Sequence, residues 1–491
     1  MRSMAFESAL PVSAEAGMAG HISRTQALVL VHIILTAIAA GVGVVFPVVQ
    51  LDSDWLIYPS CLLVTGSFIW ILWSWYAVRK SLFDPYALFM IAAWLFNGGQ
   101  ALLEVFGMNS GGILVNEVRS DTLVKALYLT TVSGLCFHTG ALVSLSRKSR
   151  STRTEPSGPE REKASRWAGW MLLGIAFVPA LKLLRGSFDL VLDYGYMGLY
   201  RRHPATPVSY ALALFLVPAV IFLVAGSRQS RGTQLFCLAL MALYAGSSLF
   251  LGQRGAATMS CVAIAWVFEK CIRRIPRPLI ALFALLALVI FPMIRGTRIT
   301  GARYRMSWES QWELLSSIGN PFSAAIAEMG HSLVTVTDTL TLVPESRPFD
   351  LGTSYFYAAS TIVPNLGWEL HPSVTHGLLC DWLTATVDPV TFNSGGGLGF
   401  SFIAESYMNF GWYGGPLWLG LVGFWITSFF LSADRADPAR QALVASFLSF
   451  FLVFARGESA IVIRGLAWYA LIPYLLVIAL TKRRRAQKAL R

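Results

Sequence analysis

The stretch GGGLGFSFIAESYMNFGWYGG, residues 395–415, lies where a long polar segment gives way to a long apolar one. It places a single carboxylate, Glu405, between two clusters of glycines. A carboxylate at the edge of a membrane span is costly unless it is paired or has a function. The apolar residues that continue to position 432 are numerous enough to cross a bilayer as a helix. We therefore expect a membrane span that begins close to a functional or structural carboxylate.

The composition of the whole chain is that of a membrane protein. Hydrophobic residues make up 55% and charged residues 13% of the 491 residues, whereas soluble domains carry about 25% charged residues. We predict an all-α polytopic membrane protein that forms a single domain over residues 1–491, with about twelve transmembrane helices. The apolar blocks are 27–49, 55–78, 85–106, 123–146, 166–184, 207–226, 233–251, 256–269, 278–294, 400–432, 439–455 and 465–481.

The distribution of basic residues predicts the orientation of these blocks. The runs RKSRSTR (147–153), Lys270 to Arg277 and Lys482 to Arg485 all fall on the same side when the blocks alternate. Cytoplasmic loops of membrane proteins are enriched in Lys and Arg, so both termini should be cytoplasmic. This placement explains the net charge of +12 without nucleic acid as a partner. Residues 147–165 then form a cytoplasmic linker, and residues 295–399 form one large extracytoplasmic loop.

Arginines at the outer ends of the blocks are candidate anion ligands. Arg254, Arg456 and Arg464 each lie at a span end beside a glycine, and Arg295 and Arg298 follow the block at 278–294. Guanidinium groups bind phosphate oxygens through two parallel hydrogen bonds. These arginines could therefore bind a diphosphate. The alternative for many of them is an interfacial position at the lipid head groups.

Proton transfer has two kinds of candidate. Ser401, Glu405 and Asn409 recur at helical spacing on one side of the expected helix, so Glu405 should have polar neighbours. Glu405 could act as a general base toward a hydroxyl, or it could hold one of the arginines in a salt bridge. The histidines of the large loop, His331, His371 and His376, titrate near neutral pH and could also serve as base, although each alone is more typical of a surface or capping residue.

Metal chemistry has weaker support. The six cysteines form no CxxC or Cys/His spacing, so we predict no metal site and no cofactor. The one acidic pair in a short outer loop is Asp52 and Asp54, which could hold a divalent cation against a lipid phosphate.

Four segments together resemble the Wzy-type polymerases that lengthen O-antigen and related bacterial surface polysaccharides. They are DPYALFMIAAWLF (84–96), LFLGQRGAATM (249–259), GFSFIAESYMNFGWYGGPLWLGLVGF (399–424) and ARGESAIVIRGLAWYALIP (455–473). The resemblance implies a GT-C-like glycosyltransferase in the bacterial inner membrane that acts at its outer face. It implies polyprenyl-diphosphate-linked oligosaccharides as substrates, membrane lipid as surroundings and a chain-length regulator protein as a further partner. It places Arg254, Arg456 and Arg464 on family arginines that engage diphosphate.

Three other functions fit parts of the pattern. An O-antigen ligase, which transfers glycan to a lipid acceptor of lipopolysaccharide, would share the architecture and the leaving group. A metal-dependent glycosyltransferase would use Asp52 and Asp54. A lipid-linked oligosaccharide flippase would be a transporter, and we would not expect it to carry an outer loop of this size.

Overall fold

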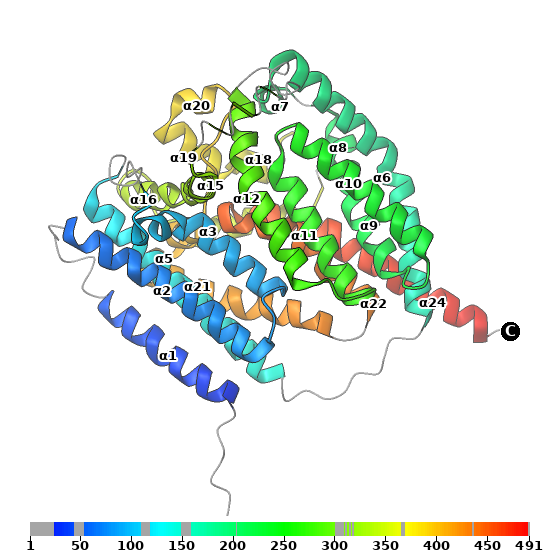
Figure 1. Ribbon diagram of the computed structural model, residues 1–491, viewed down its shortest axis with the longest axis horizontal. Coiled ribbons are helices and arrows are strands. Elements are labelled where there is room, and N and C mark those ends of the chain that lie inside the picture. Colours follow the sequence, from blue (N-terminus) through cyan, green and yellow to red (C-terminus); the bar gives the residue numbers. More distant parts are fainter. Residues whose placement is uncertain are drawn as a thin grey trace, which may run out of the picture.

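The protein is described by a computed structural model that covers most of the chain. The description leaves out residues 1–23, 44–53, 110–117, 149–158, 203, 300–308, 310–311, 314–315, 317–318, 365–368, 435–436 and 490–491. Every regular element among the described residues is a helix (Figure 1). The expectation of an all-helical protein is confirmed.

Most of the long helices form two groups that pack side by side. The first group contains α1 (Arg24–Val42), α2 (Asp54–Arg79), α3 (Pro85–Val105), α5 (Ser120–Lys148) and α21 (Phe402–Leu431). The second contains α6 (Pro159–Tyr194), α8 (Pro207–Ala213), α9 (Leu216–Ala225), α10 (Arg231–Phe250), α11 (Arg254–Cys271), α22 (Pro438–Phe451) and α24 (Ile472–Ala489). The 3₁₀ turn η2 (Leu452–Arg456), which follows α22, contacts α3 and so connects the groups.

Each of the twelve apolar blocks contains a helix among its described residues, but not all of these helices have the length and hydropathy of a membrane span. In the part of the chain that the structure describes, ten helical stretches are long and apolar enough to cross a membrane. The segment Gln26–Val42 is apolar but shorter. Helix α11, which matches the block at 256–269, is not among the ten. A multi-pass membrane protein is thus supported, with ten candidate spans where about twelve were expected.

The tightest packing joins α5 to α21 and depends on glycine. A Cβ atom on Gly140 would lie 1.9 Å from the Gly420 carbonyl oxygen, and one on Gly423 would lie 2.1 Å from the Phe137 carbonyl oxygen. Small residues allow membrane helices to approach to backbone contact, which maximises dispersion contacts where no hydrophobic effect operates. The position of α21, and with it Glu405, is set by this contact.

Helix α1 is anchored by polar side chains inside the first group. The Nε1–H of Trp70 donates to Nδ1 of His32 at 3.0 Å, and Nε2 of His32 lies 2.9 Å from the Leu135 carbonyl oxygen. His138 in turn contacts the Tyr86 hydroxyl at 2.5 Å and packs edge-on against His32. Both histidines are fully buried, so these contacts satisfy polar groups that lipid could not.

Between α12 (Arg277–Ile299) and α21 lies a series of short helices. Four of them, α15, α16, α19 and α20, lie at the upper left of Figure 1. Their bounds are α15 (Pro321–Gly330), α16 (Leu333–Leu342), α17 (Thr353–Ser360), α18 (Pro372–His376), α19 (Leu379–Val387) and α20 (Pro389–Asn393). Helix α15 packs on α3 and α12, α16 packs on α5 and α21, and α17 packs on α23 (Ser459–Arg464). The described part of the stretch expected as a large loop is therefore helical and packs against the long helices, and its first residues belong to α12, which continues to Ile299.

The other expected connection is bounded by long helices. Helix α5 ends at Lys148 and α6 begins at Pro159, so both ends of the stretch 147–165 are helical. Residues 149–158 lie outside the described part of the chain.

Candidate functional site

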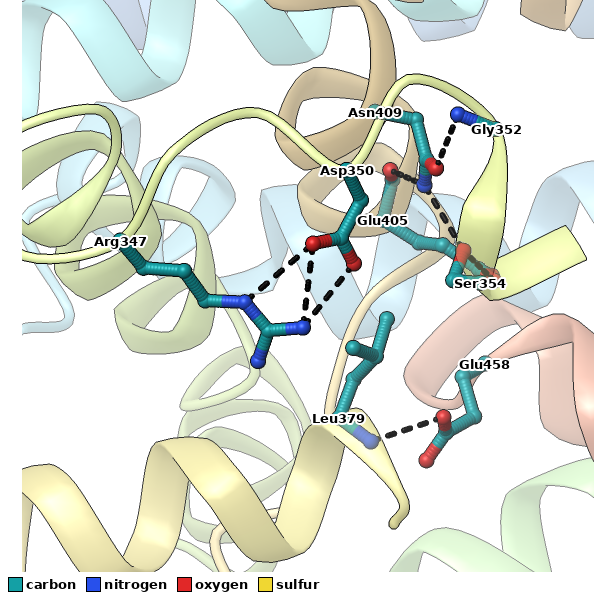
Figure 2. A network of polar contacts seen from close by, with 8 residues as sticks. All are labelled: Arg347, Asp350, Gly352, Ser354, Leu379, Glu405, Asn409 and Glu458. Atoms are coloured by element: carbon teal, nitrogen blue, oxygen red, sulfur yellow. Dashed lines mark hydrogen bonds and ion pairs between the residues drawn. The ribbon is translucent and has the colours of Figure 1, made fainter. Parts of the chain in front are cut away.

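Glu405 lies in the first turn of α21 and is 1% exposed. Its Oε1 accepts hydrogen bonds from the hydroxyls of Ser354 (3.0 Å) and Ser459 (2.6 Å), and its Oε2 accepts from the Ser459 N–H at 2.8 Å. One turn later, Asn409 donates to the Ser354 hydroxyl and accepts from the Gly352 N–H, both at 2.8 Å (Figure 2). The polar side of α21 predicted from residue spacing thus binds α17 and α23, and no arginine pairs with Glu405 among the contacts described.

A second buried carboxylate, Glu458, lies close to the first (Figure 2). It is 5% exposed and accepts hydrogen bonds from the N–H groups of Leu379 (2.9 Å) and Cys380 (3.3 Å). These are orphan N–H groups at the start of α19. Burial raises the pKa of Glu458, and the two N–H groups oppose that shift. Glu458 was not among the residues predicted from the sequence, where its only signal is its place two residues after Arg456.

Arg456 is exposed at the end of η2. Its guanidinium carbon lies 5.4 Å from the centroid of the Phe96 ring on α3. Gly399, which has a φ of +80°, lies beside it: a Cβ atom there would be 3.5 Å from Arg456 Nη2. That distance is an ordinary van der Waals contact, so the positive φ rather than lack of space favours glycine at position 399. The exposed Arg456 cation packs on the Phe96 ring.

Arg254 is placed differently, because it is already bound to a carboxylate. Both of its terminal nitrogens contact Glu328 on α15, with Nη1 to Oε2 at 2.8 Å and Nη2 to Oε1 in a second contact. Nη1 also donates to the Phe291 carbonyl oxygen of α12 at 2.9 Å. The side chains of Arg254 and Glu328 are only 11% and 18% exposed. The fork expected to bind diphosphate thus binds a protein carboxylate, and nothing in the sequence indicated Glu328 as its partner.

The remaining predicted arginines are distributed around this region. Arg464 is exposed at the end of α23 and interacts with the Tyr469 side chain. Arg295 and Arg298 lie in the last turns of α12, with side chains outside the described part of the structure.

The two principal arginines lie at the same end of the bundle. Helix α11 begins at Arg254 and contacts η2, which ends at Arg456. The opposite end of α11 carries Lys270, one of the basic residues predicted to be cytoplasmic. The structure therefore brings together two span ends that are about two hundred residues apart in sequence.

The three loop histidines have different surroundings. His371 caps α18: its Nδ1 accepts from the Ser373 N–H at 3.2 Å, and its Nε2 contacts the Val363 carbonyl oxygen at 2.9 Å. His331 ends α15. His376 stacks on the ring of Tyr357, with centroids 4.3 Å apart. Its Nε2 is buried and has no hydrogen-bond partner among the described residues.

An ion pair that the sequence analysis did not predict lies near His376. Arg347 binds Asp350 through three contacts of 3.1–3.3 Å (Figure 2), and its guanidinium lies 4.7 Å from the Trp382 ring centroid. Burial lowers the pKa of His376 below its ordinary value, Asp350 raises it and Arg347 lowers it further. His376 is therefore mainly neutral at pH 7.

The acidic pair predicted as a metal alternative is only half described. Asp54 accepts a hydrogen bond from the Ser120 hydroxyl, and Asp52 lies outside the described residues. Within the described ranges, no group of three or more His, Cys, Asp or Glu side chains could hold a metal ion.

Comparison with known proteins identifies the family. Searches of curated proteins and of solved structures give no match. The sequence model of the family described as O-antigen polysaccharide polymerase Wzy matches residues 28–488, which include every helix from α2 to α23 and most of α1 and α24. Because the match covers nearly the whole chain, the protein belongs to the Wzy family of O-antigen polysaccharide polymerases.

Proposed function

We propose that this polymerase joins oligosaccharide repeat units carried on polyprenyl diphosphate, at the outer face of the bacterial inner membrane. The observation that carries the proposal is the common location of Arg254 and Arg456 at the contact between α11 and η2. Lys270 and the Lys482–Arg485 run mark the opposite side by their basic character. Positive residues are retained in the cytoplasm, so the arginine end faces outward and both termini are cytoplasmic.

The arginines would stabilise the leaving group. In the proposed step, the acceptor hydroxyl oxygen forms a bond to the anomeric carbon of the growing glycan, and the bond from that carbon to the diphosphate oxygen breaks. Negative charge develops on the departing diphosphate, where Arg456 and Arg464, both exposed, can approach its oxygens. We propose the same role in diphosphate binding for Arg295 and Arg298, which lie near the end of α12. This chemistry requires no metal, because guanidinium groups supply the positive charge.

Arg254 would join this set by exchanging its partner. Its two terminal nitrogens are bound to Glu328, so a diphosphate must compete with that carboxylate for the same fork. Phosphate and carboxylate present similar pairs of oxygens to a guanidinium, and a doubly charged diphosphate is the stronger anion.

We assign the proton-accepting role to His376 among the residues considered. Its Nε2 has no hydrogen-bond partner in the described structure, and its lowered pKa keeps the ring neutral at pH 7. Because this nitrogen is buried, an incoming hydroxyl must displace the side chains that cover it before it can donate to the ring. A general base must reach the hydroxyl with an available lone pair. His331, His371 and Glu405 remain alternatives, although both oxygens of Glu405 already accept hydrogen bonds.

The test uses purified protein in lipid bilayers with lipid-linked repeat units. We expect polymers of several units to form, and to form equally in excess chelator. Complete dependence on added magnesium or manganese would exclude the metal-free chemistry and favour Asp54 and its neighbours. Transfer of single glycans to a lipid acceptor without elongation would indicate a ligase instead.

A further inference from the structure

The segment that carries Arg456 makes few backbone hydrogen bonds within itself. We call residues 456–459, between η2 and α23, the arginine turn. Gly457 and Glu458 have extended backbone conformations, and the Gly457 N–H makes a long contact of 3.4 Å to the Phe454 carbonyl oxygen. A non-helical turn at a buried helix junction needs partners from elsewhere for its polar groups. Its geometry is therefore decided by long-range contacts.

Three such contacts fix the turn. The Phe400 N–H approaches the Arg456 carbonyl oxygen at 3.4 Å. The Glu458 carboxylate receives the first N–H groups of α19. The Ser459 N–H and hydroxyl both donate to Glu405, which also receives Ser354 from α17. The arginine turn is thus tied to α21, α17 and α19 through two buried carboxylates.

We propose that Glu405 and Glu458 are positioning residues for Arg456, and that Glu405 does not itself exchange a proton with substrate. The proposal rests on the proposed function only for its effect on activity. Each oxygen of Glu405 receives at least one hydrogen bond and the side chain is 1% exposed, so a sugar hydroxyl has no route to a vacant lone pair without breaking the network. A rigid turn holds the Arg456 guanidinium in place before charge develops on the leaving group, which is the condition for efficient electrostatic stabilisation.

Glutamine at position 405 separates positioning from proton transfer. Its carbonyl oxygen can accept from the Ser459 N–H, while its amide group can donate to the two serine hydroxyls, which rotate to accept. Positioning is then largely kept, because every neighbour retains a partner. A general base is lost completely, because an amide does not accept a proton at neutral pH.

The activity arm compares Glu405→Gln, Glu405→Ala and Glu458→Ala in the full-length protein. We expect Glu405→Gln to retain elongation within about tenfold of the native rate. Both alanine variants should fall by about a hundredfold or more, with the loss in kcat rather than KM. Glu269→Ala is the matched control, because Glu269 is a partly buried carboxylate paired with Arg277 near the opposite end of α11. A drop of a hundredfold or more in Glu405→Gln would overturn the positioning role.

A second arm does not depend on the reaction. Hydrogen–deuterium exchange of the protein in nanodiscs reports the amides of Leu379, Cys380 and Ser459 directly. We expect Glu458→Ala to accelerate exchange at the first two and Glu405→Ala at the third, with Glu405→Gln close to the native protein. Unchanged exchange in both alanine variants would show that the hydrogen bonds to Glu405 and Glu458 do not hold the arginine turn in place. If the exchange results hold while no variant or native protein elongates lipid-linked units, the proposed function fails and the structural role stands.

Discussion

The pair formed by Arg254 and Glu328 provides the strongest test of the diphosphate site. If Arg254 binds substrate, its ion pair with Glu328 must be exchanged during the reaction, and the two residues then differ in function. If the pair only holds α15 to α11, the two residues are equivalent. Three variants decide between these cases: Arg254→Ala, Glu328→Ala and the double variant.

The stability changes can be estimated from the geometry. Removing one partner of a buried ion pair costs about 3–5 kcal/mol, because the other charge is left uncompensated. Both side chains retain some exposure, 11% and 18%, so we expect the lower part of this range. In Glu328→Ala, Arg254 keeps the Phe291 carbonyl oxygen and the Phe291 ring, at 5.5 Å, as partial compensation. The double variant removes both charges and should be more stable than the sum of the single changes implies.

Activity should follow a different order from stability. We expect Arg254→Ala and the double variant both to lose about a hundredfold in elongation rate, since each lacks the guanidinium. Glu328→Ala should retain elongation and show a lower KM for lipid-linked repeat units. In this variant no carboxylate competes with the diphosphate for the guanidinium group of Arg254. Thermal unfolding in nanodiscs and elongation of a defined lipid-linked repeat unit measure the two properties on the same samples.

One result would refute this account of Arg254. If the double variant recovered both stability and polymer length, the arginine would serve only to hold α15 against α11. The diphosphate site would then be reduced to Arg456 and its neighbours.

Four further outcomes follow from individual residues. His376→Asn should lower elongation and abolish the decline of activity in acid. Burial lowers the pKa of His376 from its ordinary value of 6.5, so the native protein should lose activity only at a pH below that value, as a pH–rate profile would show. Because the folded protein binds this proton at a lower pH than the unfolded chain does, the free energy of unfolding should decrease as the pH falls from 6.5 toward the folded-state pKa of His376. A variant without the histidine should lose that pH dependence. Arg456→Lys should elongate more slowly than native protein but faster than Arg456→Ala, because lysine keeps the charge and loses the fork. Gly423→Ala should destabilise the protein by about 1–3 kcal/mol, since its Cβ would lie 2.1 Å from the Phe137 carbonyl oxygen, whereas Gly41→Ala, with nothing within 4 Å, should be nearly neutral.

The sequence was sufficient to predict a membrane protein, because a membrane span is determined by the hydropathy of consecutive residues. Each apolar block of about 20 residues can satisfy its backbone hydrogen bonds only as a helix in lipid. Each of the twelve blocks contains a helix among its described residues, and the family resemblance carried by segments such as 399–424 and 455–473 is confirmed by a match over residues 28–488. The number of candidate spans is ten rather than about twelve among the described residues. Helix α11 carries charged residues at its ends, and the apolar part of α1 is short.

The partners of the charged residues could be decided only by the tertiary structure. Spacing placed Ser401, Glu405 and Asn409 on one side of a helix, but it could not show that Ser354 and Ser459 occupy both oxygens of Glu405. Likewise, an arginine at a span end has the same local sequence whether it faces phosphate or a carboxylate 74 residues away. Hydropathy is a property of consecutive residues, whereas ion pairs and buried hydrogen bonds depend on which helix ends the packing brings together. The membrane fold was therefore readable from the chain, and the division of roles between Arg254, Arg456 and the buried glutamates required the folded structure.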